Sequence, residues 1–152
     1  MNSGSKRKII FAKATAYNFC AIAVYRGGGK LMLSDIVESD SISQFIEDVT
    51  DLARKHAPEL LQYECSFYLT ECKELRQRLS KENIRVRGYK SEGGYLNRIV
   101  SEAGWIENNV LVNEKFPSFI DRMLSFSASD TDKTNIALDI LSDATKYIRR
   151  HF

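Results

Sequence analysis

The N-terminal part of the chain carries three short apolar runs separated by polar or glycine-rich breaks. Residues 8–13, 19–25 and 30–37 are rich in branched and aromatic side chains, which favours β-strands. Three consecutive glycines at 27–29 separate the last two runs, and glycine adopts the positive φ angles of a tight turn without steric cost. These short connections predict that the three strands form an antiparallel meander.

Strand-like and helical patterns alternate through the rest of the chain. Ser41 or Ser43 can cap a helix that Pro58 ends, because apolar residues recur at helical spacing between them. The further expected elements are a strand at 60–68, a helix at 71–81, a strand at 84–89, a helix at 95–103, a strand-like hairpin at 105–112, a helix at 116–126, a polar loop at 127–134 and a last helix at 135–150. Three antiparallel strands followed by helix-linked strands predict an α/β fold, with a mixed sheet flanked by helices. The ribonuclease-H-like architecture has this order of elements.

The composition is typical of one globular domain. The 152 residues, of which 43% are hydrophobic and 28% charged, are enough to bury a full core. We find no internal repeat and no break in composition, so we expect a single domain at 8–152 after a flexible segment at 1–7. The three cysteines, an odd number without CxxC spacing, indicate neither a disulfide framework nor a zinc site.

Net charge and hydropathy restrict the possible partners and location. The formal net charge of +2 is too small to indicate a nucleic-acid partner, so any basic surface must come from local clustering. No apolar stretch approaches the roughly 20 residues that span a bilayer. The polar N-terminus lacks the apolar region of a signal peptide, and we therefore expect an intracellular protein.

Three acidic residues suggest a site for divalent metal ions. Glu64 ends an apolar run, and Asp139 and Asp143 lie one helical turn apart at the border of the apolar face of the last helix. Clustered carboxylates repel one another unless a cation lies among them, and hard oxygen ligands suit Mg²⁺ or Mn²⁺. Two such ions about 4 Å apart can support phosphodiester hydrolysis. Ordinary surface ion pairs with nearby basic residues remain the alternative.

Basic residues cluster in the second half of the chain. Arg85 and Arg87 share one face of the expected strand at 84–89 with the aromatic Tyr89, and Lys90 and Arg98 follow. Such a face can follow a nucleic-acid backbone, and a simply solvated strand face is the alternative.

The chain resembles the C-terminal nuclease domain of the large terminase subunits of tailed phages. The stretches that carry the resemblance are the hairpin at 19–37, the strand ending in Glu64, Asn97-Arg98-Ile99 followed by Gly104-Trp105-Ile106, and the helices at 116–126 and 138–148, in which Asp139 and Asp143-Ala144 match a D-x-x-x-D-A pattern. The resemblance covers nearly the whole chain, from about Lys8 to Arg150, and the terminase ATPase domain has no counterpart.

The resemblance implies a metal-dependent endonuclease that cuts double-stranded DNA during phage genome packaging. Glu64 and Asp143 would hold two Mg²⁺ or Mn²⁺ ions, Asp139 would hold metal or orient water, and the basic residues would position the DNA. The implied partners are double-stranded DNA and the terminase ATPase domain, the small terminase subunit or the portal. The implied location is the cytoplasm of a bacterial host, with a phage or prophage gene.

The first strand departs from the terminase pattern. In that family the strand delivers an aspartate near the position of Ala12 or Lys13, and here it contains no acid. A lysine would place a cation where a metal ion should lie and weaken metal binding. The explanations are a naturally degenerate domain, a substitution, or an acid supplied from elsewhere, such as Asp35. The alternative functions are therefore a degenerate domain that binds DNA or a packaging partner, and a Holliday-junction resolvase-like nuclease.

Overall fold

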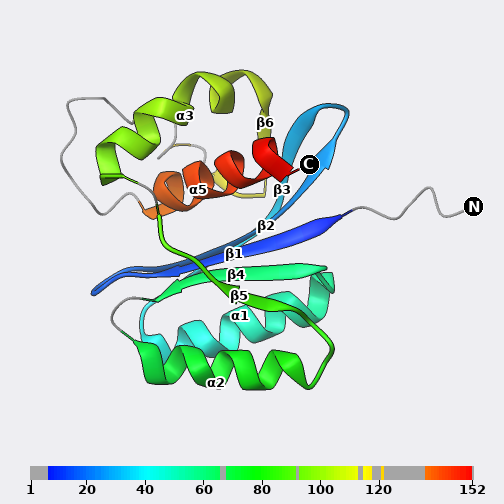
Figure 1. Ribbon diagram of the computed structural model, residues 1–152, viewed down its shortest axis with the longest axis vertical. Coiled ribbons are helices and arrows are strands. Elements are labelled where there is room, and N and C mark those ends of the chain that lie inside the picture. The colour runs from blue at the N-terminus through cyan, green and yellow to red at the C-terminus, as the bar shows by residue number, and fades with distance from the viewer. Residues whose placement is uncertain are drawn as a thin grey trace, which may run out of the picture.

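A six-stranded mixed sheet separates two layers of helices (Figure 1). The computed structural model describes residues 7–65, 68–91, 93–112, 115–117, 121 and 136–151. The strands are β1 (Lys8–Ala14), β2 (Phe19–Gly27), β3 (Lys30–Ser39), β4 (Leu60–Cys65), β5 (Val86–Gly88) and β6 (Val110–Val112), in the spatial order β5-β4-β1-β2-β3-β6. The first three pair antiparallel, and β4, β5 and β6 join them in parallel, which confirms the predicted mixed sheet.

The glycine turn and the first helix form where the sequence indicates. Gly28 and Gly29 have φ angles of 59° and 77° between β2 and β3, which only glycine adopts freely. Ser41 caps α1 (Ile42–His56) by accepting a hydrogen bond from the Gln44 backbone nitrogen. Ala57 then ends the helix in a left-handed conformation with φ of 44°, directly before Pro58.

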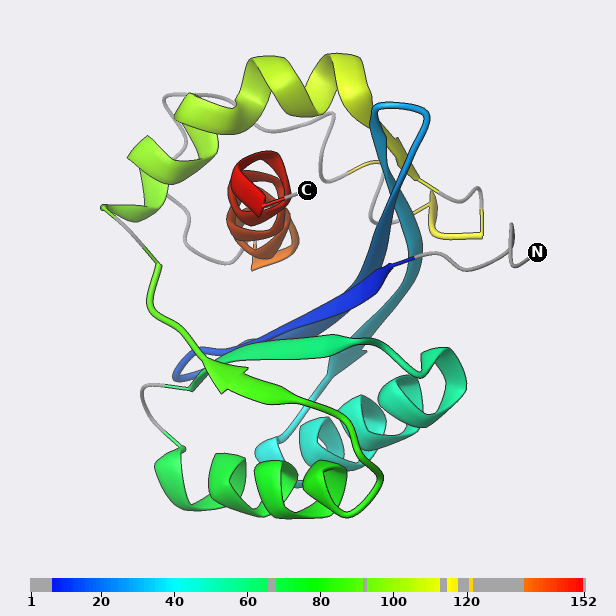
Figure 2. The same cartoon turned by 45° about the vertical axis from the view of Figure 1, so that its right-hand side comes forward.

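The remaining described helices are α2 (Leu69–Ser80), α3 (Tyr95–Asn109) and α5 (Ile136–His151). Figure 1 shows α1 and α2 on one face of the sheet and α3 and α5 on the other. In Figure 2, α5 is seen nearly end-on between the sheet and α3. The last helix is therefore placed to bring side chains directly onto the strands.

Three predicted elements have wrong boundaries. The expected hairpin at 105–112 does not form, because residues 105–109 continue α3 and only Val110–Val112 forms a strand. The strand expected at 84–89 is reduced to Val86–Gly88, and the strand expected at 60–68 ends at Cys65. The helix expected at 116–126 and the loop expected at 127–134 lie largely outside the described residues. The segment expected at 1–7 does too, except Arg7, which pairs with Glu59.

Alternation along β1 divides its side chains between two cores. Ile10, Ala12 and Ala14 belong to the cluster under α1 and α2, and Ile9 and Phe11 belong to the cluster under α5. Lys13 continues the second series, so its side chain is directed to the α5 face of the sheet. A charged residue at an inward position of a central strand demands a polar partner there.

Two further findings concern the cysteines and the hydropathy of the helices. Cys20 carries a buried thiol, and Cys72 is disulfide-bonded, which the cysteine spacing did not predict. Within the part of the chain that the structure describes, no helix is both long and apolar enough to cross a bilayer.

Candidate functional site

Adjacent parallel strands bring Lys13 and Glu64 side by side. Lys13 of β1 is the direct register partner of Glu64 of β4, and both lie near the carboxyl ends of their strands. Parallel register partners project to the same face of a sheet, here the face that α5 covers. Ligand sites in α/β folds form at this edge of the strands.

The last helix brings two further carboxylates to the same place. Asp139 and Asp143 are spaced by one turn of α5 and lie on its sheet-facing side, where each side chain is only 6% exposed. The structure thus brings together all three acids that the sequence singles out, although Glu64 lies 75 or more positions away from the pair along the chain.

The ammonium group of Lys13 lies at the centre of this acid cluster. Its Nζ atom is 3.0 Å from Asp143 Oδ2, 3.1 Å from Asp139 Oδ2 and 3.4 Å from Glu64 Oε1. It also donates a hydrogen bond of 2.8 Å to Ser91 Oγ. The Lys13 side chain is 2% exposed, so the three carboxylates share a cation that water scarcely reaches.

A second cation closes the cluster from the side of α3. Arg98 donates from Nε and Nη2 to Asp139 Oδ1, at 3.0 and 2.6 Å, and from Nη1 to the Gly93 carbonyl at 2.7 Å. Its Nε atom is also 3.7 Å from Asp143 Oδ1. Arg98, which the sequence predicts as a DNA contact, therefore donates to groups within the protein and links α3 to α5.

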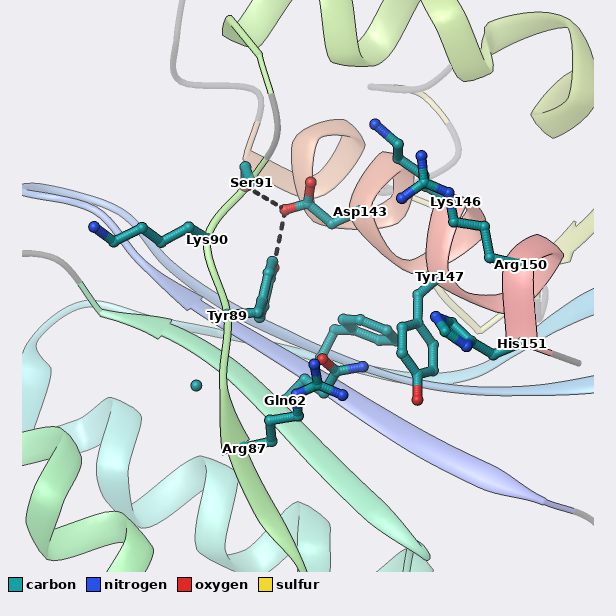
Figure 3. A pocket seen from close by; sticks show the side chains of 12 residues that line it. Gln62, Arg87, Tyr89, Lys90, Ser91, Asp143, Lys146, Tyr147, Arg150 and His151 are labelled. Atoms are coloured by element: carbon teal, nitrogen blue, oxygen red, sulfur yellow. Dashed lines mark hydrogen bonds between the residues drawn. The ribbon is translucent and has the colours of Figure 1, made fainter.

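The segment after β5 supplies neutral donors. Tyr89 Oη and Ser91 Oγ donate to Asp143 Oδ2 at 2.9 and 2.8 Å, and both side chains point toward that carboxylate in Figure 3. The Ser91 backbone nitrogen donates to Glu64. Lys13, Arg98 and these donors together satisfy the cluster, which contains three carboxylates and two cations.

The pKa values of Asp143 and Glu64 are shifted in opposite directions, although both carboxyl groups contact Lys13. Burial raises the pKa of Asp143 above its ordinary value, and Lys13 and Ser91 only partly oppose that effect. Burial also acts to raise the pKa of Glu64, but the Lys13 charge and the hydrogen bonds from Ser91 and Lys13 outweigh it and hold the pKa below its ordinary value. The difference follows from exposure, since the Glu64 side chain is 17% exposed and that of Asp143 6%.

The cluster does not fit the two divalent ions that the resemblance implies. Three convergent carboxylates are suitable ligands for Mg²⁺ or Mn²⁺. The point on which they converge is filled by the Lys13 ammonium, however, and a metal ion there would face a buried positive charge. Across the described ranges, no group of three or more His, Cys, Asp and Glu side chains is arranged to hold a metal ion.

Asp35 does not supply the missing acid. Its Oδ2 atom lies 2.8 Å from His56 Nε2 and 3.0 Å from Lys55 Nζ. Both partners belong to α1, which covers the opposite face of the sheet from α5 (Figure 1). That explanation for the absent aspartate is therefore wrong.

The other predicted basic residues lie outside the acid cluster. Arg85 directly precedes β5, Arg87 lies within it and Lys90 follows it, and all three side chains are exposed. Tyr89 does not join them, because its ring packs edge-on against Phe11 at a centroid distance of 6.0 Å and its hydroxyl is bound to Asp143. Tyr89 lies on the same side of the sheet as Arg87, but its side chain is turned into the protein, so the expectation that it is part of an exposed face is wrong.

Comparison with known proteins adds evidence on the fold. No family model and no curated protein matches the sequence. The human cytomegalovirus terminase nuclease domain, in a structure soaked with Mn, superposes with a TM-score of 0.71 at 8% identity over 96% of this chain and 86% of that one. The fowlpox virus Holliday junction resolvase superposes with a TM-score of 0.66 at 14% identity over 95% of this chain and 99% of that one. The chain has a ribonuclease-H-like fold.

A phage protein has the same fold. The large terminase of a thermophilic bacteriophage superposes with a TM-score of 0.67 at 14% identity, over 94% of this chain and 40% of that protein. Structural similarity thus includes terminase nucleases, as the sequence resemblance implies. At these identities it establishes the ribonuclease-H-like fold, and the chemistry must be argued from the residues of the site.

Sequence reasoning missed the residues that complete the acid cluster. Tyr89 ends the expected strand at 84–89 and Ser91 follows it, and nothing in their spacing points to Asp143. The sequence predicts that a lysine on the first strand places a cation where a metal ion should lie, but it does not predict that Lys13 contacts all three acids. Strict alternation along β1 could have shown that Lys13 faces inward beside Phe11, and a buried lysine requires acidic partners.

The lowered pKa of Glu64 predicts how stability depends on pH. A carboxyl whose pKa is lower in the folded state stabilises the fold above its unfolded pKa, and this contribution is lost as pH falls through the folded value. The difference in free energy of unfolding between the wild type and Glu64→Gln should therefore shrink as the pH falls below the ordinary pKa of a glutamate. Urea denaturation from pH 7 to pH 3 measures it, and a difference independent of pH would contradict the assigned ion pair.

Proposed function

We propose that this ribonuclease-H-like domain binds double-stranded DNA and does not cut it by a two-metal mechanism. The observation that carries the proposal is the position of Lys13, whose buried ammonium group contacts Glu64, Asp139 and Asp143 at 3.0–3.4 Å. Displacing it with metal ions would leave a lysine buried beside positive charges, which is costly. The acid cluster instead holds β1, β4 and α5 together.

Exposed basic residues support DNA as the partner. Arg85, Arg87 and Lys90 form a short basic edge beside the strand ends, where phosphate groups can be contacted without base recognition. A structural neighbour also binds DNA, because the fowlpox virus resolvase has been solved in complex with Holliday junction DNA. Protein partners follow from the terminase resemblance and are a packaging ATPase domain, the small terminase subunit or the portal.

A gel-shift experiment tests binding through the basic edge. Simultaneous replacement of Arg85, Arg87 and Lys90 by alanine should weaken duplex binding and lower the slope of log K against log salt by about 0.9 for each lost phosphate contact. Lys73→Ala removes an exposed charge from α2 on the opposite face and should leave binding unchanged. Equal affinity of the triple variant and the wild type would eliminate this edge as the DNA surface.

A metal-dependent nuclease is the second candidate, because the three carboxylates do converge. A plasmid-nicking assay with Mn²⁺ separates the two functions. The binding-only proposal predicts no cleavage above that of Glu64→Ala. Robust nicking by the wild type that Glu64→Ala abolishes would establish the nuclease, and Mn²⁺ titration of the two proteins would then show whether Glu64 and Asp143 hold the ion.

A junction resolvase on the same fold is the third candidate, because the fowlpox virus neighbour is a Holliday junction resolvase. Such enzymes act as dimers on branched DNA. A monomer in sedimentation that binds linear duplex and four-way junctions equally would exclude this possibility, whereas a dimer with a strong preference for junctions would favour it over duplex binding.

A further inference from the structure

A basic cleft adjoins the acid cluster and shares Tyr89, Ser91 and Asp143 with it (Figure 3). Its floor is the sheet, one wall is the segment from β5 to Ser91, and the other wall is the C-terminal half of α5. The lining residues are Phe11, Gln62, Arg87, Gly88, Tyr89, Lys90, Ser91, Asp143, Lys146, Tyr147, Arg150 and His151. The volume of about 290 Å³ is close to the lower limit of small-ligand sites, which is roughly 300 Å³.

One row of register partners crosses the floor of the basic cleft. Phe11 of β1 is the partner of Gln62 of β4, and Gln62 is the partner of Arg87 of β5. The parallel pairing directs these three side chains to the same face of the sheet. The row lies two residues before the row that contains Lys13 and Glu64, so the cleft and the acid cluster are neighbours with different chemistry.

Gln62 is an unexplained polar group at this floor. The residue is 3% exposed, and its amide nitrogen Nε2 is buried without a hydrogen-bond partner among the described residues. A buried donor without a partner destabilises a protein, and folded proteins rarely keep one. An acceptor oxygen of a ligand in the cleft would satisfy it.

The charge of the cleft selects an anion. Arg87, Lys90, Lys146 and Arg150 line it, and Asp143 is the single acid among the lining residues. The Asp143 carboxylate is already bound by Lys13, Ser91 and Tyr89 on the other side. Guanidinium and ammonium groups beside an amide donor match the oxygens of a phosphate group.

Aromatic rings beside the cationic groups indicate which kind of anion the basic cleft binds. The Tyr147 and His151 rings lie 4.4 Å apart between centroids, and Phe11 meets Tyr147 edge-on at 5.8 Å. All three residues line the cleft beside the cationic groups. Phe11 is 1% exposed and belongs to the floor, whereas Tyr147 is partly exposed and His151 exposed. Aromatic rings of this kind beside positive charges accommodate a nucleobase together with its phosphate.

We propose that the basic cleft binds a nucleoside monophosphate group, with the Gln62 amide and the Arg87 guanidinium donating to its phosphate oxygens. The group can belong to a free nucleotide or to the 5′-phosphorylated end of a DNA strand, which present the same chemistry. This site shares Arg87 and Lys90 with the basic edge proposed above, but it requires neither duplex DNA nor metal ions. Gln62→Met leaves the basic edge intact, so its effect on dAMP binding is separate from a failure of duplex binding.

Titration with dAMP, followed by NMR signals of the side-chain amides, tests the proposal. Wild-type protein should bind dAMP with displacement of the Gln62 amide signal, and deoxyadenosine, which lacks the phosphate, should bind at least tenfold more weakly. Gln62→Met keeps the size of the side chain and removes the orphan donor, so it should fold with unchanged or greater stability and lose at least tenfold in dAMP affinity.

Matched variants make the result decisive. Arg87→Gln alters an exposed residue and should weaken dAMP binding without affecting the fold, whereas Lys73→Ala on the opposite face should change nothing. Hexanucleotides with and without a 5′-phosphate distinguish a strand end from a free nucleotide. Equal binding of dAMP and deoxyadenosine, no binding of dAMP, or an unchanged affinity in Gln62→Met would each overturn the proposal.

Discussion

Replacing Lys13 by aspartate is expected to make the stability of the protein depend on divalent metal ions. In EDTA, the variant loses the buried counter-charge and gains a fourth carboxylate beside Glu64, Asp139 and Asp143. Loss of one partner from a buried ion pair costs about 3–5 kcal/mol, and the free energy of unfolding in urea should fall by at least that range.

Metal ions should reverse much of this loss in Lys13→Asp. Binding to the folded state alone contributes about 2.7 kcal/mol at an ion concentration 100 times Kd, which corresponds to a rise in Tm of roughly 5–10 °C for a chain of this size. The wild type should show no such rise with Mn²⁺, because its own ammonium group holds the position. Thermal denaturation with and without Mn²⁺ measures the difference.

Lys13→Met is the matched control for this experiment. It removes the ammonium group without adding a ligand, so it should lose stability in EDTA and recover less with Mn²⁺ than Lys13→Asp. A wild type that Mn²⁺ stabilises as strongly as Lys13→Asp would contradict the central role of the lysine. Plasmid nicking by Lys13→Asp but not by the wild type would show that the residue at position 13 decides whether the domain cuts DNA.

Arg98→Ala should produce the second large effect, a loss of about 2–3 kcal/mol in the free energy of unfolding. Arg98 is 13% exposed and donates twice to Asp139, which is 6% exposed, as well as to the Gly93 carbonyl. The loss is smaller than for Lys13 because Asp139 keeps the Lys13 ammonium at 3.1 Å. Chemical denaturation at pH 7 measures the change.

Arg98→Lys distinguishes charge from geometry. Lysine keeps the positive charge but cannot donate in the same fixed, planar arrangement, so it should restore less than half of the lost stability. Full restoration would mean that charge alone matters. A loss below about 0.5 kcal/mol in Arg98→Ala, the range of ordinary surface substitutions, would show that Arg98 does not hold α3 against α5.

Elements that local residues specify could be predicted from the sequence, and elements that depend on packing could not. The meander β1–β3 and helix α1 were predicted well, because glycine turns, a serine cap and proline act locally. Residues 105–109 were assigned to a strand, although they continue α3. Their apolar and aromatic content suits either state, and packing of α3 on α5 favours the helix.

The sequence by itself determined the order of elements, the mixed sheet and the identity of the three acids Glu64, Asp139 and Asp143. It also revealed that the first strand lacks an acid, since composition and alternation along a strand are local properties. Only the tertiary structure decided that Lys13 fills the space among the acids and that Arg98 turns inward. Only it revealed that the Gln62 side-chain nitrogen, at the floor of a basic cleft, has no hydrogen-bond partner within the described part of the chain. The physical reason is that ion pairs, burial and register join residues far apart in the chain, and no spacing along a sequence encodes the distance between them.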